Sequence, residues 1–377
     1  MKRRYLMTPG PSPVPASIRE ALAQEIMHHR TDEFIEILKE TNEGLKYLFC
    51  TQNPVITFAS SGTGAMEAAV CNFFSGGDTV IAVVAGKFGE RWVEIGKAYG
   101  LNVVVHTVPS GSIPQTADLM KLIDTHKNVK GILTTLSETS TATTLDIKAM
   151  GSLTRDKNIL LIVDAISGLG QDELRTDEWG IDVVVSGSQK GCMLPPGLGF
   201  ISVSEKAKGF LKSATLPKYY FDLTRALKAY EKNDTPFTPA VTLIIGLRES
   251  LALIRKDGIE KMWERFKKMS YATQEAARAI GLEIFSKSPS SSVTAIVSPA
   301  GMNAKDIVKK LRKEYGVSIA AGQGELEQKI IRIAHMGWIN EQDLMMCFSL
   351  LEKVLKDLGY TFTVGASLAR LQEVFYA

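Results

Sequence analysis

Six apolar strand segments alternate with helical segments up to about residue 204 of this chain. Such an alternation predicts a sheet of mostly parallel strands covered by helices on both faces, because parallel strands are joined by crossover helices. The segment that begins at Val55 also reads as a strand. The expected fold class is therefore α/β. The six strands are expected at Thr79–Ala85, Asn102–Val108, Gly131–Leu136, Ile159–Ala165, Ile181–Ser186 and Gly199–Val203.

The pattern changes after about residue 240. A helical stretch ends near Gly258, a long helix follows from about Ile259 to Ala279, and strands then mix with helices, which predicts a smaller α+β domain. We expect an N-terminal arm at 1–17, a large domain at 18–257 and a small domain at 258–377. The expected elements of the small domain are strands at Val293–Ser298, Val317–Ala321 and Ile330–His335 and helices capped by Asn303 and Asn340.

Lys190 follows one of the expected strands at a place where a charged side chain is costly. It ends the run Ser-Gly-Ser-Gln-Lys at 186–190, between two apolar strands, so its ammonium group must be solvated, paired or chemically converted. A lysine in a desolvated pocket loses its proton readily and can form an imine with an aldehyde, as in pyridoxal phosphate enzymes. The alternative is a lysine at a strand end that reaches into water.

Asp164 ends the all-apolar strand that precedes Lys190 by one βα unit. Open α/β folds place their ligands at the carboxyl ends of strands, where a carboxylate could keep a pyridinium nitrogen protonated. Taken alone, this aspartate is better explained as a helix N-cap. The pairing of Asp164 with Lys190 favours the cofactor.

A third element lies at 55–69, which reads as strand, glycine and hydroxyl turn, then helix. The turn Ser-Ser-Gly-Thr-Gly at 60–64 leaves free N–H groups at a helix start, which attract an anion such as phosphate. Ordinary helix capping explains the same residues. The spacing matches neither the P-loop nor the dinucleotide fingerprint, so a monophosphate cofactor fits better.

These motifs together resemble the class V aminotransferases, which are fold type I pyridoxal phosphate enzymes, and among them the alanine–glyoxylate and serine–pyruvate aminotransferase group. The resemblance covers nearly the whole chain. It implies the fold type I architecture, with a large domain around a mostly parallel seven-stranded sheet and a smaller α+β C-terminal domain. The motifs that carry it are Thr8–Pro11, Ser60–Gly64, Gly86–Arg91, Glu138–Thr141, Val163–Asp164, Ser186–Lys190, Leu247–Leu251 and Arg332–Gly337.

The resemblance implies a role for each cofactor-binding residue. Lys190 would hold pyridoxal 5'-phosphate as a Schiff base and then move protons, and Asp164 would pair with the ring nitrogen. Phe88 would stack on the ring, where many relatives have tryptophan, and Thr139 would offer a hydroxyl to the ring oxygen. From the residues alone, Phe88 could equally fill the core and Thr139 could be a turn hydroxyl. The phosphate contacts would come from Ser61, Gly62, Thr63 and Gln189.

The resemblance also implies a homodimer with shared active sites. Thr238 lies where the family contacts the phosphate of the neighbouring subunit, whereas Thr235 replaces a frequent tyrosine. The arm at 1–17 would be ordered and would reach the active site across the partner subunit. In that arm, Gly10 would contribute to substrate binding.

Arg332 is the residue that the resemblance assigns to the substrate carboxylate, through a bidentate pair. Its alternating strand context would otherwise place it in solvent. We see no second arginine placed for the side-chain carboxylate of aspartate or glutamate, which favours small monocarboxylic donors. Arg30 and Arg91 could still approach the site in the folded chain.

Composition is consistent with these expectations. The 377 residues are 45% hydrophobic, and 44 basic against 41 acidic residues leave a net charge of +3. This balance calls for neither nucleic acid nor a membrane surface, and no stretch has the length of a membrane span. The N-terminal segment lacks the apolar run of a signal peptide. The four scattered cysteines suggest reduced thiols in the cytoplasm and no metal site.

Three functions follow from these motifs. The leading one is an aminotransferase that moves nitrogen from alanine or serine to glyoxylate or pyruvate. The second is a pyridoxal phosphate lyase of the cysteine desulfurase type, which needs a nucleophilic cysteine on a mobile loop and commonly a histidine where Gln189 stands. The third is a non-catalytic protein on an inherited fold. Retention of both Lys190 and Asp164 favours an enzyme.

Overall fold

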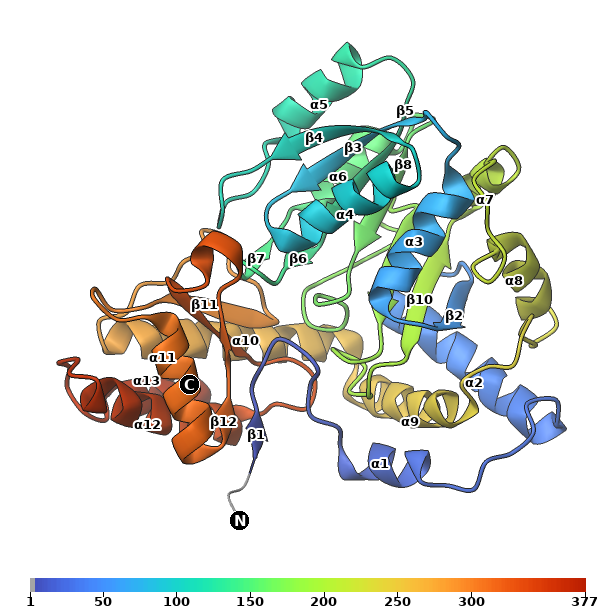
Figure 1. The fold of residues 1–377 in the computed structure, drawn as a ribbon. Helices are drawn as coiled ribbons and strands as arrows, with labels where there is room; N and C mark the ends of the chain where they lie inside the picture. The colour runs from blue at the N-terminus through green and yellow to red at the C-terminus, as the bar shows by residue number, and fades with distance from the viewer. Residues whose placement is uncertain (1–3) are drawn as a thin grey trace.

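The computed structural model describes residues 4–377 and is built around one large sheet and one small sheet (Figure 1). The large sheet has seven strands, and every neighbouring pair is parallel except the two pairs that contain β10. The expected seven-stranded, mostly parallel sheet is thus confirmed. In spatial order its strands are β2 (Val55–Ala59), β10 (Leu198–Val203), β9 (Val183–Gly187), β8 (Leu160–Asp164), β5 (Val129–Thr135), β3 (Thr79–Val84) and β4 (Asn102–Thr107).

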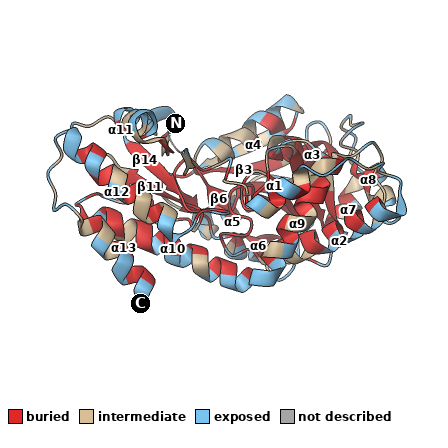
Figure 2. Ribbon diagram, turned by 90° about the horizontal axis from the view of Figure 1, so that it is seen from below, coloured by how far each residue is buried: buried red, intermediate tan, exposed pale blue. Residues whose placement is uncertain are grey.

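Both faces of the large sheet are buried, because successive strand residues point to opposite sides. In β9, Val183 and Val185 pack in one apolar cluster and Val184 packs in another. Figure 2 shows buried residues along the central strands and the inward sides of the helices. On one face lie α3 (Gly62–Phe73), α4 (Lys87–Ala98), α7 (Glu205–Leu211) and α8 (Leu223–Tyr230); on the other lie α2 (Asp32–Phe49), α5 (Thr116–Thr125), α6 (Ile147–Thr154), α9 (Val241–Asp257) and α10 (Ile259–Ala279).

The small sheet is antiparallel and packs with the C-terminal helices. Asn303 and Asn340 cap α11 and α12 through side-chain hydrogen bonds, as expected. The small-sheet strands are β11 (Val293–Val297), β14 (Ile330–Ala334) and β13 (Ala320–Ala321), and the other elements of this part are α11 (Ala304–Lys310), the π-helix η1 (Leu311–Tyr315), the 3-10 helix η2 (Gly324–Leu326), α12 (Glu341–Asp357) and α13 (Ala366–Tyr376).

The N-terminal arm is ordered from residue 4 onward and joins the two sheets, whereas residues 1–3 of the expected arm lie outside the described part. Its strand β1 (Tyr5–Leu6) pairs with β12 (Val317–Ser318), and Ala334 donates its N–H to the Met7 carbonyl. The single strand expected at 317–321 is wrong in one respect. Its first half pairs with the arm as β12 and its second half with β14 as β13, so it divides into two.

Three short elements complete the chain as far as it is described: α1 (Ala16–Leu22), β6 (Ser137–Glu138) and β7 (Thr143–Thr144). β6 and β7 form a two-stranded hairpin just beyond the carboxyl end of β5. Among residues 4–377, no helix combines the length and the apolar content that crossing a membrane would need.

Candidate active site

The predicted site residues other than Thr238 meet near the carboxyl ends of β8 and β9, the place where α/β sheets bind ligands. Asp164 is the last residue of β8, and Lys190 lies three residues beyond the end of β9. The same region is reached by the starts of α3 and α4, the hairpin β6–β7, the N-terminal arm and strand β14.

Lys190 is buried, with 8% of its surface exposed. Its Nζ donates hydrogen bonds to the Pro9 carbonyl and, over 3.3 Å, to Ser167 Oγ. Burial lowers the pKa of this lysine to about 8, although the Asp164 charge opposes the shift. The expectation of a desolvated lysine is confirmed, and the alternative of a lysine reaching into water is wrong.

Gly10 lies directly against the Lys190 side chain. A Cβ atom at Gly10 would stand 2.4 Å from Lys190 Cε, and the φ angle of +107° is one that residues with side chains rarely adopt. The arm is fixed on both sides of this contact, because Ser12 Oγ donates to the Lys190 carbonyl and Met7 is bonded to the small sheet. The arm of this chain therefore reaches its own Lys190.

Asp164 is 2% exposed and makes one hydrogen bond, in which Oδ1 accepts from Ile166 N over 2.8 Å. Turn residues and no α-helix follow directly after it, so the carboxylate closes a turn, and the alternative of a helix N-cap is wrong. Its Oδ2 accepts no hydrogen bond from residues 4–377. Burial raises the pKa of this carboxyl to about 7, and the charges of Arg91 and Lys190 oppose the shift.

The turn before α3 provides an anion-binding geometry. Ser61 caps the helix through Gly64 N, whereas the N–H groups of Gly62 and Thr63 find no acceptor in the described residues. Gln189 borders this turn: its Oε1 is buried without a partner, and a Cβ at Gly187 would contact both that oxygen and Gly62 N. The four residues predicted for phosphate binding, Ser61, Gly62, Thr63 and Gln189, are therefore neighbours.

The start of α4 is capped by side chains from the β6–β7 hairpin. Gly86 offers no capping side chain, so Glu138 Oε2 accepts from the N–H groups of Phe88 and Gly89, and Ser140 Oγ accepts from Lys87 N. These bonds satisfy three of the four orphan donors of the helix start. They hold the half-buried Phe88 in the site region. Sequence analysis missed this role of Glu138, because the bonds span about fifty residues.

Thr139 connects three parts of the site. Its Oγ1 donates to Ser167 Oγ over 2.5 Å, and Ser167 in turn accepts from Lys190. Its carbonyl accepts from Arg332 Nη1 over 2.9 Å. Ser167 lies in the turn after Asp164, and nothing in its sequence context pointed to Lys190. The Thr139 hydroxyl is thus part of a buried hydrogen-bond network that includes Ser167 and Lys190.

Arg332 extends from β14 toward this hairpin and is 5% exposed, so a solvent-facing strand position is excluded. Its Nε and Nη2 donate to the Ala321 carbonyl over 3.0 and 2.8 Å. Burial lowers the pKa of this arginine to about 10, while the Glu138 charge raises it. No carboxylate pairs with Arg332 among residues 4–377.

The two other arginines occupy different places. Arg30 pairs with Asp234 on the surface and makes no hydrogen bond or ion pair with the site residues within residues 4–377. Arg91 lies at the site, because its Nη1 donates to Thr63 Oγ1 over 3.3 Å and its guanidinium lies 4.9 Å from the centre of the Phe88 ring.

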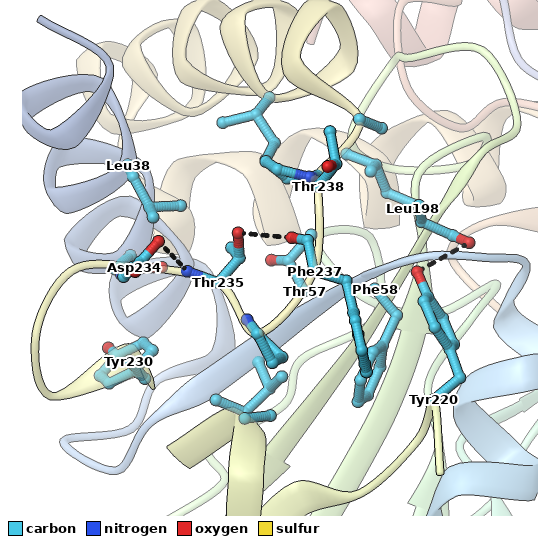
Figure 3. A pocket seen from close by; sticks show the side chains of 18 residues that line it. Leu38, Thr57, Phe58, Leu198, Tyr220, Tyr230, Asp234, Thr235, Phe237 and Thr238 are labelled. Carbon is cyan, nitrogen blue, oxygen red and sulfur yellow. Dashed lines mark hydrogen bonds between the residues drawn. The ribbon is translucent and has the colours of Figure 1, made fainter. Parts of the chain in front are cut away.

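Thr238 lies apart from Lys190, in an exposed loop before α9. It lines a hollow together with Tyr220 and Phe237 (Figure 3). Tyr220 stacks on Phe237 at this hollow, and the ring centre of Tyr219, which is 69% exposed, lies 5.7 Å from that of Phe237. Thr235 turns inward and donates to the Phe237 carbonyl. The described chain does not bring Thr238 to its own phosphate turn.

The assembled residues fit pyridoxal phosphate. Lys190 provides an amine of lowered pKa, Asp164 presents a free carboxylate oxygen, and the start of α3 offers unpaired N–H donors. Arg91 links the half-buried Phe88 ring to Thr63 of this helix start, and the Gln189 side chain borders the same turn. Within residues 4–377, no three His, Cys, Asp or Glu side chains are grouped closely enough to hold a metal ion.

Comparison with known proteins gives consistent matches over the whole chain. The family model described as Aminotransferase class-V matches residues 4–337. The soluble hydrogenase 42 kDa subunit of Anabaena cylindrica is 43% identical, with 98% of each chain covered. The L-aspartate–glyoxylate aminotransferase of Paracoccus denitrificans is 35% identical, covering 98% of this chain and 95% of the relative. The serine–glyoxylate aminotransferase of Methylorubrum extorquens is 34% identical, covering 97% and 94%.

Solved structures match equally completely. The ureidoglycine–glyoxylate aminotransferase of Bacillus subtilis superposes with a TM-score of 0.95 at 28% identity, covering 100% of this chain and 99% of that one. The alanine–glyoxylate aminotransferase of Nostoc sp. superposes with a TM-score of 0.89 at 30% identity, covering 94% and 96%. The expected fold type I architecture is confirmed by these structures.

Proposed function

We propose that this chain, which belongs to the class-V aminotransferase family, moves an amino group from alanine or serine to glyoxylate or pyruvate. The chain is a pyridoxal-phosphate-dependent aminotransferase, and the proposal concerns its donor and acceptor. Four of the proteins described above carry glyoxylate in their names, whereas their donors differ. This recurrence supports glyoxylate as an acceptor.

The observation that carries the proposal is the hydrogen bonding of Arg332. A guanidinium has five N–H bonds, and three of them are donated to the carbonyls of Ala321 and Thr139. One N–H on Nη1 and one on Nη2 remain without an acceptor in the described chain. These two free donors equal in number the two oxygens of a carboxylate, which a guanidinium can bind in a bidentate pair. Arg332 would therefore bind the α-carboxylate of the substrate.

The placement of Arg30 and Arg91, the two other candidate arginines in the described chain, supports a monocarboxylic donor. Arg30 is paired with Asp234 on the surface, and Arg91 is bonded to Thr63 at the start of α3. Neither contacts Arg332 or the residues that hold it. Donors with a second carboxylate would therefore lack a partner for that charge, which is costly to bury unpaired.

Catalysis would then depend on proton transfer at the substrate Cα. Bound pyridoxal phosphate supplies an aldehyde that accepts the amino group and a ring that withdraws electrons. Lys190, with a pKa of about 8, would take the Cα proton and return it at the adjacent carbon. Ser167 would hold the lysine amine in reach, and Asp164 would keep the ring nitrogen protonated. The cofactor would be held by Ser61, Gly62, Thr63, Gln189, Phe88 and Thr139. The substrate would be contacted by Gly10 and Arg332.

We further propose a homodimer with shared active sites. The aromatic surface of Tyr219, Tyr220 and Phe237 adjoins the phosphate turn, since Tyr220 OH donates to the Ala59 carbonyl over 3.5 Å. Thr238 lies on the same surface and is exposed, so it is available to a second chain. We also propose that the chain divides into an arm at 1–17, a large domain at 18–257 and a small domain at 258–377. A cytoplasmic location would keep the four free thiols reduced.

The cysteine desulfurase alternative is not favoured, because that chemistry needs a thiolate. Burial raises the pKa of Cys50 and Cys71 to about 11 and that of Cys192 and Cys347 to about 12. Cys192, the thiol nearest to Lys190 in the sequence, is 1% exposed and therefore packs as a small apolar side chain.

The proposal is tested by assaying the purified holoenzyme with alanine, serine, aspartate and glutamate against glyoxylate, pyruvate and 2-oxoglutarate. The highest kcat/KM is expected for alanine or serine with glyoxylate. Lys190→Ala serves as the control for background transfer. A higher kcat/KM for aspartate or glutamate than for alanine would overturn the monocarboxylic donor, and no transfer to glyoxylate would overturn the acceptor.

A further inference from the structure

The proposed phosphate site contains a charge problem. The residues assigned to the phosphate, Ser61, Gly62, Thr63 and Gln189, are all neutral. A phosphate monoester carries a charge of about −1.5 to −2 at neutral pH, and a helix start supplies only about half of a positive charge. Burying an anion of this size without a compensating cation is costly. The site therefore needs a cation close to the start of α3.

Arg91 is placed to meet this need. It lies on the first turns of α4, and its Nη1 donates to Thr63 Oγ1 over 3.3 Å. Because the Thr63 oxygen accepts this bond, the proton of the Thr63 hydroxyl stays available to an incoming acceptor. The guanidinium lies 4.9 Å from the Phe88 ring centre, so the ring helps to fix its position.

The charge of Arg91 is not used elsewhere in the described part of the chain. No carboxylate lies within ion-pair distance of its guanidinium in residues 4–377, although neighbouring Lys87 pairs with Glu90 on the same helix. The Arg91 charge acts on the site, since it opposes the burial that raises the pKa of Asp164 and adds to the burial that lowers the pKa of Lys190. An unpaired arginine bonded to the phosphate turn is poised for an anion.

We propose that Arg91 is the cation that binds the phosphate of pyridoxal phosphate, together with Thr63 and the N–H groups at the start of α3. This inference rests on the proposed placement of the phosphate at that turn. It makes Arg91 a cofactor-binding residue and removes it from the candidates for a second substrate carboxylate. Arg332 and Arg91 then serve two different anions, the substrate carboxylate and the cofactor phosphate.

The test compares two ligands that differ only in the phosphate group. Apoenzyme is titrated with pyridoxal phosphate and with pyridoxal, and binding is followed by the visible absorption of the lysine-linked ligand. For Arg91→Gln, we expect roughly 10- to 150-fold weaker binding of pyridoxal phosphate, because one charge-assisted hydrogen bond to the phosphate is lost. The binding of pyridoxal, which has no phosphate, should be unchanged. Arg91→Lys should recover part of this loss. Arg278→Gln, which removes an exposed arginine paired with Glu275 on α10, is the matched control.

Three outcomes would overturn the proposal, and each is distinct. An equal loss of both ligands would show that Arg91 acts through Phe88 or through folding, which thermal unfolding of the variant would separate. Unchanged pyridoxal phosphate binding with a selective loss of aspartate turnover would assign Arg91 to the substrate. If neither Arg91→Gln nor Ser61→Ala changes the ratio of the affinity for pyridoxal phosphate to the affinity for pyridoxal, the placement of the phosphate itself is wrong.

Discussion

Replacing Arg332 with lysine is expected to weaken every α-amino carboxylate substrate while leaving the bound cofactor unchanged. The side chain is 5% exposed, and its three hydrogen bonds to Ala321 and Thr139 fix the guanidinium plane. Lysine keeps the positive charge but presents it as a point, so it cannot bind both carboxylate oxygens and both backbone carbonyls at once. The substrate would lose the alignment of its Cα–H bond as well as binding energy.

The magnitude follows from the two unpaired N–H groups of Arg332. Lysine can replace one of the two bonds to the carboxylate, so one charge-assisted hydrogen bond is forfeited, at about 1.5–3 kcal/mol. This corresponds to a fall in kcat/KM of roughly 10- to 150-fold at 1.4 kcal/mol per factor of ten. The fall should be similar for alanine, serine and the 2-oxo acids, because all of them carry the same carboxylate.

The assay is the single-turnover half-reaction in stopped flow, with alanine and with alaninamide. Alaninamide has no carboxylate, so its reaction should be equally slow in wild type and in Arg332→Lys. Arg278→Lys, an exposed arginine on α10, controls for the substitution itself. Unchanged alanine kinetics in Arg332→Lys would remove Arg332 from the substrate site. A matching loss for alaninamide would show that the substitution distorts the site instead of deleting a carboxylate contact.

Three further predictions concern the remaining residues. Lys190→Ala should abolish the lysine-linked cofactor that borohydride traps, measured by mass spectrometry of the digested protein; trapping at an unchanged level would contradict the assignment. Asp164→Asn should gain stability to urea relative to the wild-type apoprotein as the pH rises from about 4 to about 7, because burial raises the pKa of Asp164 to about 7 and folding of the wild type therefore takes up a proton that the unfolded carboxyl lacks; a stability difference that stays constant over this range would refute the buried carboxylate. Tyr219→Glu should convert a sedimenting dimer to a less active monomer, whereas Tyr271→Glu, an exposed tyrosine on α10, should not; a fully active wild-type monomer would exclude shared sites.

The parts of the fold that could be predicted are those with a local signal. The strands and the turn at 60–64 are continuous segments, so hydrophobic patterning located them, and Lys190 and Asp164 were found because charge at the end of an apolar strand is conspicuous. The division of the strand at 317–321 could not be predicted in this way. It depends on pairing with the arm more than three hundred residues earlier, a contact that leaves no trace in local sequence.

The same distinction applies to the site. Glu138 was visible only as part of a motif, because its function is to accept hydrogen bonds from the start of a helix fifty residues away. Ser167 was not identified, since a serine in a turn is common and its contact with Lys190 exists only in the folded chain. Arg332 was assigned by resemblance, and its alternating strand pointed to solvent until the contact with Thr139 was seen.

The balance of charge in the assembled site explains why its arginines stay unpaired. Three cations, Lys190, Arg91 and Arg332, face two buried carboxylates, Asp164 and Glu138, and the carboxylate of Glu138 is occupied by the helix start. Buried cations without partners cost folding free energy, so a chain that needed only stability would pair them. A cofactor phosphate and a substrate carboxylate would each supply the missing negative charge. The unpaired arginines would thus make the apoprotein less stable and would make the site bind two anions more tightly, one at each of two defined positions.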